Sequence, residues 1–80
     1  MLEALHMELN TAFRMFTDAW RIYRKYHGIR NDQDDKWTGL VEEAGAFQRR
    51  YGNCRMAMEL SMTVLEQLEA DAKEEEEKKR

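Results

Sequence analysis

Residues 2–27 carry an apolar stripe that is wider than one neighbouring helix can cover, and this limits what the chain can fold into. Apolar side chains fill the first and fourth positions of successive heptads, and more follow on both flanks. The heptad positions hold Leu2, Leu5, Leu9, Ala12, Phe16, Ala19, Tyr23 and Tyr26, one flank holds His6, Phe13, Trp20 and His27, and the other holds Met15 and Ile22. A two-stranded coil needs only the central seam, so this helix is expected to contact at least two other elements.

Two further helices are predicted from the rest of the chain. Apolar residues recur at spacings of three and four over residues 35–51 and again over residues 54–72. Glycine, asparagine and aspartate fill the segments between the helical stretches, which is typical of turns. Proline is absent from the chain and only four glycines are present, so long helices are favoured over strands.

These patterns predict an all-α fold, namely an antiparallel three-helix bundle with a long first helix. We expect a single helical domain over residues 1–72, with helices at about residues 2–27, 35–51 and 54–72. The charged residues 73–80 are expected to form a frayed tail. Because eighty residues bury only a small core and the single Cys54 cannot form an internal disulfide, we expect added stability from a homo-oligomer, most simply a homodimer.

The distribution of apolar and charged residues indicates where the protein acts. No stretch approaches the roughly 20 apolar residues that cross a bilayer, so we expect a cytoplasmic protein without membrane partners. The net charge of −3 argues against general affinity for nucleic acids. Charges nevertheless alternate in blocks: residues 31–48 hold five acidic residues and one basic, whereas residues 49–58 hold three basic residues and none acidic.

Candidate metal and catalytic motifs are incomplete. The acidic residues after Asn31 are spaced like calcium ligands, but Lys36 falls where an EF-hand loop needs glycine or a ligand. Glu3 and His6 have the spacing of a carboxylate-bridged metal site, yet such sites need a second copy of the motif. No nucleophile, base and orienting acid can be assembled from the sequence. We therefore expect no metal, no cofactor and no catalytic activity.

The charged blocks leave two further interpretations open. Three arginines gather at the second turn and form a basic corner of Arg49, Arg50 and Arg55. This corner could contact phosphates, although the following helix presents methionines where readers of base edges carry Arg, Asn or Gln. Three aspartates around the first turn form an acidic link of Asp32, Asp34 and Asp35. Together with Glu42 and Glu43 they could imitate phosphates and occupy a basic channel, or they could simply form a solvated helix face.

Several short motifs carry a resemblance to a group of known proteins. They are W-x-x-Y-x-K-Y at Trp20 to Tyr26, D-x-x-W ending at Trp37, L-V-E-E-A at Leu40 to Ala44, and L-x-x-L-E at Leu65 to Glu69. In these motifs the chain resembles small helical proteins carried by phages and mobile elements of Gram-positive gut bacteria. The resemblance implies action by stoichiometric binding, for example as an inhibitor of a host defence nuclease in the manner of anti-CRISPR proteins. It implies no site residues.

The sequence thus predicts a non-enzymatic protein–protein interaction module whose partner is a larger protein or a protein–nucleic-acid complex. The alternatives are a small nucleic-acid-associated regulator using the basic corner, and a structural homo-oligomer with no other partner. On helix one we expect the flank of Met15 and Ile22 to face outward, with Phe13, Trp20 and Tyr23 in the core or in a dimer contact. The expected partner-binding residues are Arg14, Met15, Arg21, Ile22, Asp32, Asp34, Asp35, Arg49 and Arg50.

Overall fold

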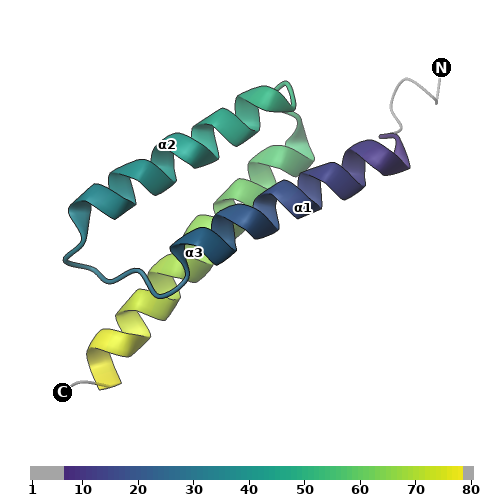
Figure 1. Cartoon of the computed structure of the whole chain (residues 1–80). Helices are drawn as coiled ribbons and strands as arrows, with labels where there is room; N and C mark the ends of the chain where they lie inside the picture. The colour runs from purple at the N-terminus through teal and green to yellow at the C-terminus, as the bar shows by residue number, and fades with distance from the viewer. Residues whose placement is uncertain (1–6, 79–80) are drawn as a thin grey trace.

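The computed structural model describes residues 7–78, which form three helices that all pack against one another (Figure 1). They are α1 (Leu9–Tyr26), α2 (Asp34–Arg50) and α3 (Arg55–Lys78). Helix α2 runs antiparallel to both other helices, so α1 and α3 point the same way. The described residues contain no strand, and the predicted all-α three-helix bundle is confirmed.

The breaks between helices follow from local chemistry. Gly28 and Gly52 adopt positive φ angles of 87° and 66°, which glycine accepts without steric cost and which end α1 and α2. After α2 the backbone N–H of Asn53 donates to the carbonyl of Gln48 at 2.8 Å, closing the helix end. Asp34 and Asp35 lie in the first turn of α2, where carboxylates offset the positive end of the helix dipole.

The core consists of two clusters at the two ends of the bundle. Near the α2–α3 turn it contains Met15, Ala19, Phe47 and Ala57. Near the α1–α2 link it contains Ile29, Leu40 and Leu68. Ile22 and Val64 pack against both clusters and make the interior continuous.

Hydrogen bonds from tyrosines join the helices around this core. Each of the three tyrosines donates its hydroxyl to a carboxylate on another helix, in the pairs Tyr23–Asp71 (3.1 Å), Tyr26–Glu43 and Tyr51–Asp18 (2.5 Å). Together the pairs connect α1 to α3 once and α1 to α2 twice. Such partly buried hydrogen bonds fix the relative rotation of helices, which apolar contacts alone specify less strictly.

The helix bounds differ from expectation at both ends of the chain. Met7 and Glu8 precede α1, whereas the expected helix over residues 2–6, with Glu3 and His6, lies outside the described residues. Helix α3 continues to Lys78 and is the longest helix of residues 7–78, so residues 73–78 are helical and extend α3 past its expected end at residue 72. Residues 79–80 of the expected tail lie outside the described residues. Ala72 is buried, Asn31 donates a hydrogen bond to Glu76, and an ion pair joins Glu74 to Lys78 at 3.8 Å. These contacts stabilise the last turns of α3.

Candidate protein-interaction surface

Helix α1 carries two apolar seams with the same spacing, only one of which faces the bundle. The inner seam holds Met15, Ala19, Ile22 and Tyr26, which pack in the core clusters. The outer seam holds Leu9, Phe13, Phe16 and Trp20, which are exposed by 85, 70, 52 and 55% respectively. Both seams repeat at steps of four, three and four residues, the spacing by which one helix packs against another.

The N-terminal part of α1 extends beyond the rest of the bundle. Figure 1 shows the start of this helix passing the α2–α3 turn, and residues 7–10 are all exposed. Met15 is the first buried residue of the helix. Within residues 7–78, therefore, no other segment covers the side chains of Leu9 and Phe13.

A shallow apolar groove continues the outer seam toward α3. Phe16, Ala19, Trp20 and Tyr23 line one side of the groove, and Thr63, Val64 and Gln67 line the other. The ring of Trp20 lies 6.0 Å from that of Tyr23, which lies 5.6 Å from the imidazole of His27, centroid to centroid. The aromatic row thus extends along most of α1 and ends beside α3.

Opposite charges flank the aromatic row at Tyr23, about one helical turn beyond the Trp20 end of the outer seam. On the α3 side Asp71 accepts hydrogen bonds from Tyr23 (3.1 Å) and Gln67 (2.8 Å), and Glu74, which pairs with Lys78 at 3.8 Å, lies one helical turn further on. On the other edge Arg24 follows Tyr23 directly in the chain and is exposed. The aromatic row is therefore bordered there by an acidic edge on α3 and a basic side chain on α1.

The expected orientation of α1 is wrong. Met15, expected to face outward, is completely buried, and Ile22 packs against both core clusters. Phe13 and Trp20, expected in the core or in a dimer contact, are exposed, so only the dimer contact remains a prediction for them, whereas Tyr23 packs against a core cluster. Both flanks of α1 are apolar, so helical periodicity shows that two faces exist but not which of them the other helices cover.

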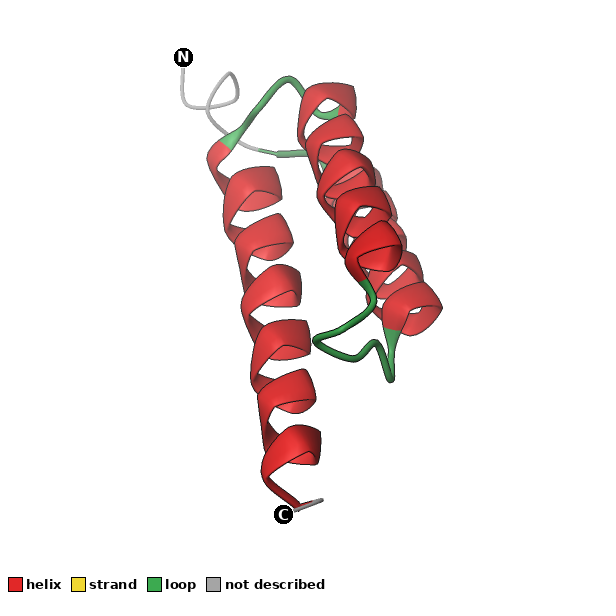
Figure 2. Cartoon of the chain, turned by 90° about the vertical axis from the view of Figure 1, so that its left-hand side faces the viewer, coloured by secondary structure: helices red, strands yellow, loops and turns green. Residues whose placement is uncertain are grey.

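The remaining expected contact residues do not form one site. The acidic link lies at one end of α2 and the basic corner at the other, as the loops in Figure 2 show. Arg14 and the acidic link are exposed. Asp18 of α1 pairs with Arg50 at 3.2 Å and with Arg21 at 3.7 Å, while Arg55 pairs with Glu59 at 3.4 Å. Part of the basic charge at this end of the bundle is thus balanced by the carboxylates of Asp18 and Glu59.

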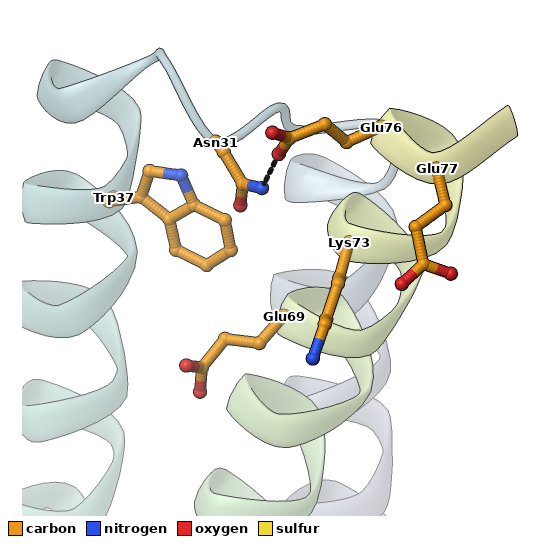
Figure 3. Close-up of a pocket in the computed structure, with 6 residues that line it drawn as sticks. All are labelled: Asn31, Trp37, Glu69, Lys73, Glu76 and Glu77. Atoms are coloured by element: carbon orange, nitrogen blue, oxygen red, sulfur yellow. Dashed lines mark hydrogen bonds between the residues drawn. The ribbon is translucent and has the colours of Figure 1, made fainter. Parts of the chain in front are cut away.

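A cleft near the C-terminal end of α3 is lined mainly by polar side chains. Figure 3 shows Trp37 of α2 facing α3 across this cleft, which is lined by Asn31, Trp37, Glu69, Lys73, Glu76 and Glu77. The indole N–H of Trp37 donates to the Arg30 carbonyl at 2.9 Å, which holds the link against α2. No group of three or more His, Cys, Asp or Glu side chains within residues 7–78 is placed to hold a metal ion. The polar side chains of this cleft thus hold the segment between α1 and α2 against α2 and α3.

The shifted pKa values belong to the tyrosine–carboxylate pairs. Burial and the hydrogen bond to Glu43 raise the pKa of Tyr26 to about 12. Hydrogen bonds from Lys25 and Tyr26 lower the pKa of Glu43. The hydrogen bond to Asp71 raises the pKa of Tyr23, and the bond to Asp18 raises that of Tyr51. These shifts follow from interhelical contacts, so they connect the stability of the bundle to pH.

The chain matches no protein-family model, no curated protein and no solved structure. None of the helices within residues 7–78 is both long and apolar enough to cross a membrane.

Proposed function

We propose that this chain is a non-enzymatic protein-binding module that acts by stoichiometric association through the outer seam of α1. One observation carries the proposal: four large apolar side chains, three of them aromatic, form an exposed row on a helix whose neighbouring face is already packed in the core. Exposed apolar residues scattered over a surface need no explanation, but a contiguous row of this size is typical of an interaction site.

The dimensions of the outer seam fit a protein partner. Its four side chains expose on the order of 500 Å² together, which approaches the area that one partner contributes to a specific interface. Aromatic residues supply much of the binding energy in such interfaces, because each buries a large area while few torsions are restricted. Their heptad spacing fits a second helix lying along α1.

The basic corner offers a weaker surface for the alternative of nucleic-acid binding. Arg50 and Arg55 each already pair with a carboxylate of the same chain. Affinity for nucleic acid grows with the number of arginines and lysines free to neutralise phosphates.

The resemblance to small phage proteins supports a narrower proposal, in which the partner is a cytoplasmic host defence nuclease or its nucleic-acid complex and the chain is its inhibitor.

A binding experiment with a charge placed in the outer seam tests the proposal. Phe13→Glu inserts a carboxylate into the seam, whereas Val41→Glu inserts one at a residue of α2 that is 59% exposed. The tagged chain would be immobilised and offered both an untagged copy of itself and a lysate of its source cells. We expect the wild type and Val41→Glu to retain protein and Phe13→Glu to lose at least tenfold in retention, with equal helical circular dichroism. Equal retention by the two variants would contradict the proposal.

A further inference from the structure

We propose that α1 of a second copy of this chain covers the outer seam, so that the protein forms a two-fold dimer with the two α1 helices parallel. The inference rests on the proposed function, because it names the occupant of the same surface. It also goes further, since it fixes the stoichiometry and the direction of the partner helix.

The pattern of the outer seam is that of a two-stranded coil. In a heptad frame that starts at Phe13, Phe13 and Trp20 take the first position, and Leu9 and Phe16 take the fourth, with no third apolar row on the solvent side of α1. A strict two-position seam is sufficient for a single partner helix, whereas a wider stripe needs several. In a parallel pair each residue of the seam lies beside its own counterpart, so the same surface is complementary to itself.

The projecting start of α1 supports a helical partner of the same length. Leu9 is 85% exposed and lies in the part of the helix that passes the α2–α3 turn (Figure 1). An isolated helical end is marginal in water, because most helical stability in proteins comes from packing an apolar face. Two copies aligned in parallel would place both projecting ends together and cover both.

The charged edges decide between the parallel and the antiparallel pair. A two-fold axis along the helices places the Arg24 edge of one copy against the Asp71 and Glu74 edge of the other, at matching height. A two-fold axis perpendicular to the helices, as in an antiparallel pair, would instead place acidic edge against acidic edge and basic edge against basic edge. Exposed ion pairs add little stability, but charges beside a seam set the orientation of paired helices.

The size of the chain also favours self-association. Nine apolar residues are buried within the described part of a chain of 80 residues, and the only cysteine is a free thiol. A chain of this size commonly gains stability from a partner subunit. Two seams of on the order of 500 Å² each would bury about 1,000 Å² in total, the lower bound of a specific interface, so a dimer that dissociates on dilution is expected.

Sedimentation equilibrium of the full chain tests the occupant. We expect the apparent mass to rise from monomer to dimer with concentration for the wild type and for Val41→Glu. Trp20 is exposed to a similar extent as Val41, but Trp20→Glu should remain monomeric at concentrations where the wild type is mostly dimeric. A wild type that stays monomeric up to millimolar concentration would overturn the inference.

Disulfide trapping tests the direction of the helices. In a Cys54→Ser background, Leu9→Cys adds one thiol at the exposed start of the seam, and serine suits the position before α3 as an N-cap. In the parallel dimer the two introduced thiols are adjacent, and mild oxidation should link most of the chains in pairs. Val41→Cys in the same background should not cross-link. A dimer by sedimentation without the Leu9→Cys cross-link would overturn the parallel arrangement.

These outcomes separate the inference from the proposed function. A monomeric chain that binds another protein, and loses that binding in Phe13→Glu, would refute the second copy while retaining a protein-binding seam. A monomeric chain whose seam binds phospholipid vesicles, and no protein, would refute both. Equal behaviour of Phe13→Glu and Val41→Glu in self-association and in capture would also refute both.

Discussion

At the scale of single residues, neighbours on α1 have opposite roles. Met15 is completely buried, whereas Phe13, two positions earlier, is 70% exposed. Composition does not separate them, because both are large and apolar. Only the position of α2 and α3 decides which side chain is in the core.

Truncation of these two residues should have very different effects on stability. We expect Met15→Ala to lower the free energy of unfolding by about 2–5 kcal/mol, because a fully buried side chain is lost and a cavity remains. Phe13→Ala should change it by less than about 0.5 kcal/mol, as for an exposed residue. Urea unfolding at a concentration where the chain is monomeric would measure both values. A larger loss for Phe13→Ala than for Met15→Ala would contradict the assignment of the two seams.

The Tyr26–Glu43 pair should make stability depend on pH at both extremes. The pKa of Tyr26 is raised from 10.0 to about 12 in the folded chain, so its contribution is present below pH 10 and is lost as the pH rises from 10 through 12. The pKa of Glu43 is lowered from 4.5, so its contribution is present above pH 4.5 and is lost as the pH falls through the folded pKa.

Tyr26→Phe removes the hydroxyl and should flatten both limbs of this profile. The alkaline limb should be affected more, because the titrating phenol itself is absent, whereas Lys25 still pairs with the Glu43 carboxylate and keeps the pKa of Glu43 lowered. Urea unfolding of the wild type and Tyr26→Phe between pH 3 and 12 checks this. Parallel profiles for the two proteins would show that the pair does not couple stability to pH.

At the scale of helices, α2 depends most on close packing, because two glycines lie within it. A Cβ atom at Gly39 would lie 2.9 Å from the Tyr26 hydroxyl oxygen, so this glycine permits the approach of α1. At Gly45 the nearest atom is 3.3 Å away and belongs to the flexible end of the Arg49 side chain. Sequence periodicity predicts α2 itself but not this difference, which depends on the neighbouring helix.

Alanine at the two glycines should have opposite effects. Gly45→Ala is expected to raise the free energy of unfolding by about 0.5–1 kcal/mol, because alanine favours the helix and Arg49 can move. Gly39→Ala should lose this gain and destabilise, because the new methyl group meets the tyrosine that bonds Glu43. Thermal unfolding of both variants, and of Gly39→Ala combined with Tyr26→Phe, would measure this. No relief in the double variant would show that the Tyr26 hydroxyl is not the obstacle.

At the scale of the whole molecule, the chain has one packed interior and one uncovered seam on the same helix. If a second copy covers the seam, folding and association are coupled, and stability becomes a function of concentration. In that dimer α2, the acidic link and the basic corner would remain on the outer surface. They would stay available for a larger partner.

The midpoint of thermal unfolding should therefore depend on concentration. For the wild type and Val41→Glu we expect it to rise by several degrees for each tenfold increase in concentration, because only the folded dimer buries the seam. For Trp20→Glu it should stay constant. Circular dichroism melts over a hundredfold range of concentration would check this, and a constant midpoint for the wild type would count against coupled association.

The three helices and the excess of apolar surface on the first one could be predicted from the amino-acid sequence. Both follow from local causes: the three-and-four spacing of apolar residues, the absence of proline, and glycines at the turns. Which face of α1 is buried could not be predicted, because the two seams have equal spacing and differ only in their position relative to α2 and α3. For the same reason Met15 and Ile22 lie in the core and not on the surface, where they were expected. The exposed row on α1 consists instead of Leu9, Phe13, Phe16 and Trp20.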